Sequence, residues 1–239
     1  MSWQTYNPEN PINPDDYMGQ FHNELLEFFV NNVDEICDDP ELDSAPTMLT
    51  DTATLLIPKV IELLNITPTI EEKNTAFGAC ILAVTRPCDR RNLFMDISEF
   101  STEFQTIWNS IKSEVNNLTV SNINNILTNL KGIDTTIQNS SLVQLEKTSA
   151  FQINSIARFS SAYWVNEKLN PNSPWIEISA DRGGEYAMKD PPDWVYADIE
   201  GALIGAWFTA NPFVALGGGA ATSAYHAAKK AYKKKCGTT

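Results

Sequence analysis

The sequence predicts an all-α protein of six to eight helices that ends in a Gly/Ala-rich helical hairpin. Three observations lead to this fold class. Apolar residues recur every three or four positions through most of the chain. Proline, asparagine and glycine interrupt that spacing and separate the helices. The 25 residues from 201 to 225 carry no formal charge. With 239 residues, 43% of them hydrophobic and 20% charged, the chain can bury a globular core.

The apolar spacing places the predicted helices in order along the chain. They cover residues 15–38, 48–64, 70–84, 93–118, 118–132, 141–169, 195–210 and 212–231. Pro58 is expected to kink or divide the second helix, and Gly132 is the natural end of the fifth. Residues 1–14, rich in proline and asparagine, predict an extended arm. The remaining irregular stretch admits at most one short strand, near 175–179.

Charge is distributed unevenly and divides the chain into parts. Residues 1–150 hold 22 acidic against 8 basic residues, whereas the tail from Lys229 to Lys235 holds five lysines and no acid. The net charge of −13 repels phosphate backbones, so we expect no nucleic-acid partner. We therefore divide the chain into the arm (1–14), an acidic helical body (15–192), and the Gly/Ala-rich hairpin with its basic tail (193–239), which is expected to pack on the body.

The uncharged C-terminal run supports two interpretations. Asn211-Pro212 is a favourable start for a new helix, so the run divides into two helices, each with small residues at four-residue spacing. In the first interpretation this hairpin packs on the body or on a protein partner. In the second, residues 194–228 insert into a bilayer while the lysines bind anionic lipid. The candidate contact residues are Gly201, Gly205, Trp207, Phe208, Pro212, Phe213, Lys229, Lys230, Lys233, Lys234 and Lys235.

Signals for chemistry are weak. His22 stands near Glu24 as a candidate base, but a polar position on an amphipathic helix is the simpler interpretation. Arg182 lies in a Gly-Gly loop that could hold an anion or could be a solvated turn. The sequence contains no G-x-S-x-G, H-E-x-x-H, G-x-G-x-x-G or phosphate-loop motif. Its four cysteines form no C-x-x-C pair, so we expect no metal, no cofactor and no enzymatic activity.

Three short stretches resemble a family of bacterial proteins to which no activity is assigned. They are the Y-x-G-x-x-H-N stretch at 17–23, the helical stretch at 156–164 with its Ser and Tyr-Trp, and the D-x-x-G-A-x-x-G-A stretch at 198–206. The resemblance implies a secreted or envelope protein, because many relatives carry a leader, and it implies no activity.

From these observations we predict a non-enzymatic helical protein whose C-terminal hairpin packs on the body or on a partner. The alternative is a membrane-active, bacteriocin- or toxin-like protein. No signal peptide is visible at the start of the chain, so a cytoplasmic location is expected. A secreted or envelope location is the alternative if a leader was removed.

Overall fold

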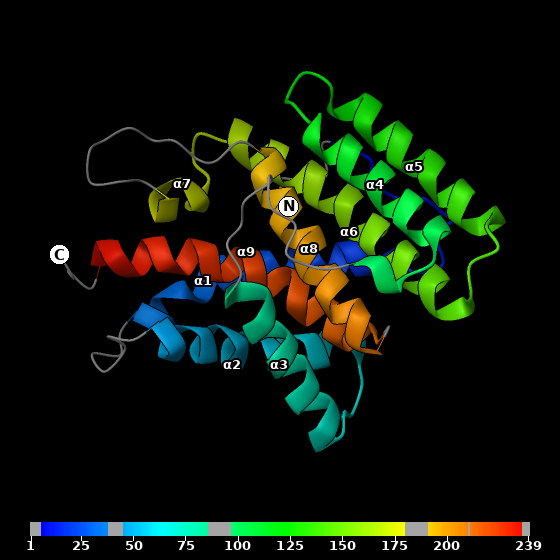
Figure 1. The fold of residues 1–239 in the computed structure, drawn as a ribbon. Coiled ribbons are helices and arrows are strands. Elements are labelled where there is room, and N and C mark those ends of the chain that lie inside the picture. Colours follow the sequence, from blue (N-terminus) through cyan, green and yellow to red (C-terminus); the bar gives the residue numbers. More distant parts are fainter. Residues whose placement is uncertain (1–5, 38–44, 86–96, 180–190, 210, 236–239) are drawn as a thin grey trace.

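Helices make up the regular secondary structure of the computed structural model, which describes residues 6–37, 45–85, 97–179, 191–209 and 211–235. Within these ranges the α-helices are α1 (Tyr17–Cys37), α2 (Ala45–Leu64), α3 (Ile70–Thr85), α4 (Thr102–Asn116), α5 (Ile123–Asn139), α6 (Gln144–Leu169), α7 (Pro174–Ser179), α8 (Pro191–Thr209) and α9 (Pro212–Lys235). A short 3-10 turn, η2 (Ile97–Glu99), precedes α4. The all-α prediction is confirmed (Figure 1).

The C-terminal helices lie at the centre of this arrangement. Helix α8 packs against α6 on one side and α9 on the other, and α9 also contacts α1, α2 and α3 (Figure 1). Helices α4 and α5 pack against α6 on the flank away from α2 and α3. All residues of α9 from Phe213 to Thr222 are buried. The α9 part of the uncharged run, from Phe213 to Thr222, is therefore enclosed by the other helices.

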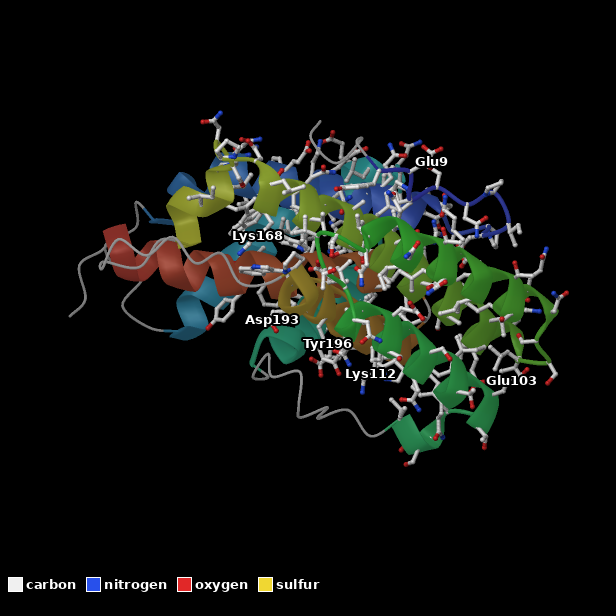
Figure 2. All side chains as sticks on the ribbon, turned by 90° about the horizontal axis from the view of Figure 1, so that it is seen from above. Glu9, Glu103, Lys112, Lys168, Asp193 and Tyr196 are labelled. Carbon is white, nitrogen blue, oxygen red and sulfur yellow. The ribbon has the colours of Figure 1, made fainter. Side chains whose placement is uncertain are left out.

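A lysine joins the α4 flank to this centre. The Nζ atom of Lys112 on α4 lies 5.9 Å from the ring centroid of Tyr196 on α8, and both residues are labelled in Figure 2. Partial burial lowers the pKa of Lys112, and the negative charge of Glu200 opposes that shift. The ammonium group of Lys112 thus lies near the face of the Tyr196 ring, and its aliphatic stem extends from α4 toward α8.

Helix α6 is enclosed over most of its length. Every residue from Ser149 to Glu167 is buried, although this stretch contains serine, asparagine, glutamine and an arginine. A helix buried on all sides is usually apolar all round. Since α6 is not, its polar side chains require partners inside the protein. Those partners define the candidate site described below.

The segment near 175–179, for which at most one short strand was expected, is the helix α7. It accounts for the helix beyond the predicted six to eight. Trp175 supplies the physical reason, because its indole Nε1 donates to Tyr163 Oη at 2.6 Å and its ring meets Trp164 edge-on at 4.9 Å. Burial of this indole and the presence of Pro174 at the first helical position favour a helix, although the alternating polar and apolar residues resemble those of a strand.

Three predicted boundaries also differ. Helix α4 begins at Thr102, not near 93, because the Ser101 hydroxyl caps it by accepting from the Phe104 amide at 3.2 Å. Helix α5 continues through Gly132 to Asn139, since this exposed glycine keeps a helical conformation. Helix α2 is one continuous helix with Pro58 inside it, so of the two expected outcomes, a kink or a division into two helices, the division is wrong.

Alkaline pH is expected to destabilise the protein through Tyr163. Burial raises the pKa of Tyr163 well above its ordinary value of about 10, and the charge of Glu167 adds to the shift. Because the pKa of Tyr163 is higher in the folded state than in the unfolded state, its neutral form contributes stability that is complete below about pH 10. That contribution is lost as the pH rises toward the folded-state pKa. Above pH 10 the free energy of unfolding of the wild type should fall by up to about 1.4 kcal/mol per pH unit more than that of Tyr163→Phe. Urea unfolding between pH 8 and 11 measures this, and parallel curves would contradict it.

Candidate functional site

A buried polar cluster joins α1, α6 and α8. The carboxylate of Asp198 accepts hydrogen bonds from the Ser160 hydroxyl at 2.5 Å and from the Trp164 indole Nε1 at 2.8 Å, both on its Oδ2 atom. Its Oδ1 atom lies 3.2 Å from His22 Nε2, too misaligned for a hydrogen bond but close enough for an ion pair. All four side chains are fully buried. We call these residues the His–Asp cluster.

The stretches at 17–23, 156–164 and 198–206 meet at this cluster. The 17–23 stretch supplies His22, the 156–164 stretch supplies Ser160 and Trp164, and the 198–206 stretch supplies Asp198. Ser160 and Trp164 lie one helical turn apart, so they face the same neighbour.

Close packing of α1 on α6 positions the histidine. Gly19 donates its amide to Ser155 Oγ at 3.0 Å, and a Cβ atom at Gly19 would lie 2.5 Å from Phe159 Cδ2. One turn further along, Asn23 Nδ2 donates to the Phe159 carbonyl at 3.0 Å. The glycine and the asparagine therefore fix the distance and the register between the two helices, and His22 lies between them in sequence.

A second polar cluster ties the N-terminal segment to α5 and α6. Its centre is the buried carboxylate of Asp134. The groups that reach this carboxylate are Asn13 at 2.9 Å, Asn154 at 2.7 Å, Asn10 at 2.8 Å and Arg158 at 3.2 Å. Arg158 also donates to the Pro8 carbonyl and pairs with Asp16. Burial raises the pKa of Asp134, while Arg158 and the three amides oppose the shift. Together these contacts hold the segment before α1 against the bundle.

Removing the charge at Asp134 should destabilise the fold more than removing it at Asp16. Asp134→Asn leaves the fully buried Arg158 with one carboxylate partner, Asp16. The new amide nitrogen would also face asparagine side chains that donate hydrogen bonds to Asp134 in the wild type. We expect the free energy of unfolding to fall by about 2–4 kcal/mol. The matched control is Asp16→Asn, because the Asp16 side chain is 21% exposed. This variant should lose only about 1 kcal/mol of the free energy of unfolding. Urea unfolding measures both, and equal losses would contradict the assignment.

The contact between α8 and α9 depends on glycine. A Cβ atom at Gly201 would lie 2.4 Å from the Gly218 carbonyl oxygen, and one at Gly205 would lie 2.4 Å from the Val214 carbonyl oxygen. The predicted groove on α8 is thus used within the chain. On α9 these glycines face Gly218, Thr222 and the first turn at Val214. Gly219 faces the His–Asp cluster, since its Cβ would meet the His22 ring at 3.4 Å.

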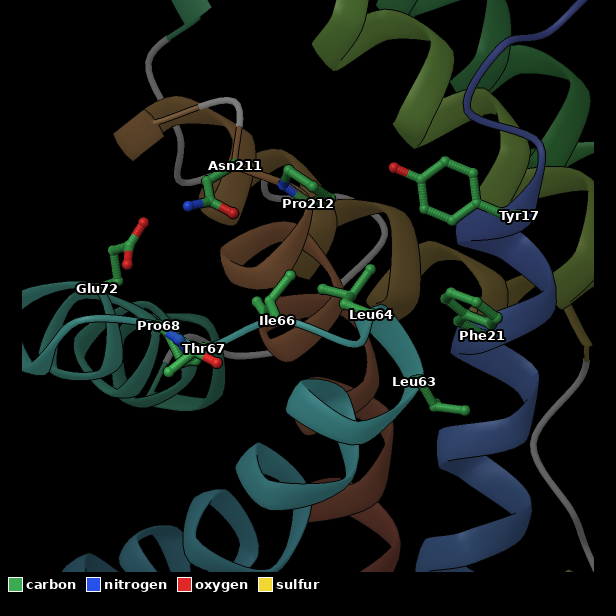
Figure 3. A pocket seen from close by; sticks show the side chains of 10 residues that line it. All are labelled: Tyr17, Phe21, Leu63, Leu64, Ile66, Thr67, Pro68, Glu72, Asn211 and Pro212. Atoms are coloured by element: carbon green, nitrogen blue, oxygen red, sulfur yellow. The ribbon is translucent and has the colours of Figure 1, made fainter.

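An open pocket of about 650 Å³ lies beside the start of α1, at the α2–α3 connection and the α8–α9 turn (Figure 3). Its exposed wall is about equally polar and apolar, with a carboxylate and an amide at one side. The lining residues are Tyr17, Phe21, Leu63, Leu64, Ile66, Thr67, Pro68, Glu72, Asn211 and Pro212. Tyr17 and Phe21 form an edge-to-face pair with centroids 5.6 Å apart. The pocket therefore combines an aromatic corner with an acidic edge.

The candidate residues from the sequence fall into three groups. His22, Gly201, Gly205 and Phe213 are buried within the bundle, and Pro212 is half-buried at the pocket. Trp207, Phe208, Lys229, Lys230, Lys233, Lys234 and Lys235 lie on α8 and α9, but their side chains are outside the described structure. Arg182 lies outside the described residues.

Most of the other residues at these sites could not be selected from the sequence. Asp198, Asp134 and Arg158 carried no local signal of partnership, because their contacts come from segments far apart in the chain. Glu72 did carry one: Thr69 and Glu72 have the spacing of a capping box, and each side chain bonds the other's amide, at 3.1 and 2.7 Å. No group of three metal-ligating side chains occurs among the described residues.

Comparison with known proteins finds no relative of this chain. No protein-family model, curated protein or solved structure matches the chain. Within the described part of the chain, no helix has both the length and the apolar character that a membrane crossing requires.

Proposed function

We propose that this chain is a non-enzymatic binding protein, in which the C-terminal hairpin is part of the core and a ligand occupies the pocket at the hairpin turn. The observation that carries the proposal is the pocket itself. It has the volume of small-molecule sites, and it combines aliphatic and aromatic side chains with polar groups that could orient a ligand. Three segments distant in sequence form it, and the His–Asp cluster holds one of them, α1, against α6 and α8.

The arrangement of the His–Asp cluster supports a structural role over catalysis. In a nucleophilic triad the histidine accepts the proton of the serine. Here Ser160 donates to Asp198 instead, and the carboxylate lies between the serine and the histidine. All three side chains are 0% exposed, so a substrate would have to open the bundle to reach them.

Packing also favours the core role of the hairpin over membrane insertion. Asp198 and Glu200 place two buried carboxyl groups on α8, and each would have to enter the bilayer if the hairpin inserted. Inserting α9 would also break its contacts with α1, α2 and α3. We therefore expect the full chain to leave anionic liposomes intact and a 1–193 truncation to unfold. Dye release by the full chain, with the truncation still folded, would favour the membrane-active alternative.

Binding of an uncharged solvatochromic dye tests the pocket. Nile red should bind the full chain with blue-shifted emission, because Phe21, Leu64 and Ile66 give the pocket an apolar part. Ile66→Asp should weaken dye binding at least tenfold, since Ile66 lines the pocket and is 38% exposed, which lets it tolerate a charge. The matched control is Ile70→Asp: Ile70 is 79% exposed and lies outside the lining.

The control should bind the dye as the wild type does. Equal binding by wild type, Ile66→Asp and Ile70→Asp would show that the dye does not use this pocket and would contradict the proposed function.

A further inference from the structure

We infer that the ligand of the pocket is a small organic cation with an apolar chain, of the alkylammonium class; this inference rests on the proposed function. The lining contains one carboxylate and no lysine, arginine or histidine. The first 150 residues, which supply eight of the ten lining residues, have 22 acidic against 8 basic residues. An anionic ligand would therefore meet repulsion and no counter-charge, whereas a cation meets both attraction and a direct partner.

Glu72 is the partner that the structure offers to the positive group. It is half-buried at the start of α3, and its Oε2 atom accepts from the Thr69 amide at 2.7 Å. That bond holds the side chain in place. The other oxygen, Oε1, has no hydrogen bond or ion pair within the described residues, and Figure 3 shows the carboxylate at the edge of the pocket. A fixed carboxylate with one unused oxygen can bind a cation at low entropic cost.

The apolar part of the ligand fits the rest of the wall. In Figure 3, Tyr17 and Phe21 lie on the side of the pocket away from Glu72, and Leu64 and Ile66 lie between them. A chain that runs from the carboxylate to the aromatic pair would contact aliphatic side chains along its length and ring edges and faces at its end. The side chain of Asn211 lies near the acidic edge, where its Oδ1 atom accepts a hydrogen bond from the Phe213 amide at 2.9 Å.

The chemistry is tested by competition between matched eight-carbon ligands. Octyltrimethylammonium, octanoate and 1-octanol, each below its aggregation limit, displace Nile red from the full chain. We expect the ammonium to compete at least tenfold better than octanoate and at least threefold better than 1-octanol. Choline, which has the charge without the chain, should compete at least tenfold worse than octyltrimethylammonium.

Variants at adjacent glutamates separate a local contact from the general negative charge. Glu72→Gln should reduce the advantage of the ammonium over 1-octanol at least threefold, because the amide can still cap α3 but carries no charge. Glu71→Gln is the matched control: it removes the same charge from the same helical turn, and Glu71 is exposed and outside the lining. It should leave the advantage unchanged.

The outcomes distinguish the two proposals. If 1-octanol or octanoate competes as well as the ammonium, and Ile66→Asp still abolishes dye binding, the cation inference is wrong and the binding function stands. If Glu71→Gln and Glu72→Gln act alike, the selectivity comes from overall charge and the assignment of Glu72 is wrong. If no ligand competes and Ile66→Asp has no effect, both proposals are wrong.

Discussion

Gly201→Ala is expected to lower the free energy of unfolding by about 2–4 kcal/mol, although it adds only one methyl group. The new Cβ would lie 2.4 Å from the Gly218 carbonyl oxygen and 2.4 Å from Thr222 Oγ1. The carbonyl belongs to the backbone of a buried helix and cannot rotate away as a side-chain end could. Helices α8 and α9 would have to separate, and this would disturb the contacts of α9 with α1, α2 and α3.

Gly132→Ala is the matched control for this prediction. Gly132 is also inside a helix, but it is exposed, and a Cβ there would have no atom within 4 Å. Because alanine has the higher helix propensity, this variant should gain up to about 1 kcal/mol. Urea unfolding followed by tryptophan fluorescence measures both variants. A Gly201→Ala protein as stable as the Gly132→Ala protein would show that α8 and α9 are not packed as closely as described.

The helices that the sequence predicts well are those whose burial has a regular period. In α1 and α4 one stripe faces the bundle, so apolar spacing identifies them directly. Helix α7 has six residues, too few for a period to show, and the contacts of Trp175 with Tyr163 and Trp164 stabilise it. Local pattern could not reveal those contacts.

The candidate site was harder to predict than the helices for the same reason. His22 was selected as a polar residue on a helix, but its partner Asp198 lies 176 positions later in the chain. The polar residues of α6 are buried because they form hydrogen bonds with other helices, and those partners lie far away in the sequence. The Gly201–Gly205 spacing predicted a close helix contact without showing where on α9 its counterpart lay.

Asp198→Ala should have the largest effect among the polar variants, a loss of about 3–5 kcal/mol. The substitution leaves the Ser160 hydroxyl and the Trp164 indole without their acceptor, and it removes the carboxylate beside His22. Each of these groups is fully buried, so water cannot replace the lost partner without opening the bundle. Domains of this size are stable by about 5–15 kcal/mol, so the variant should lie near the limit of folding.

Asp198→Asn distinguishes the loss of hydrogen bonds from the loss of volume. Its amide keeps the shape of the side chain and one oxygen that can accept from Trp164, so we expect a smaller loss, about 1–2 kcal/mol. Glu24→Ala serves as the surface control, since Glu24 is only half-buried and bonds Gln20 one turn away; it should change stability by at most about 0.5 kcal/mol. Urea unfolding ranks the three variants. If Asp198→Ala is as stable as Glu24→Ala, then the cluster does not hold α1, α6 and α8 together, and the histidine and carboxylate would have to be reconsidered as groups that serve chemistry.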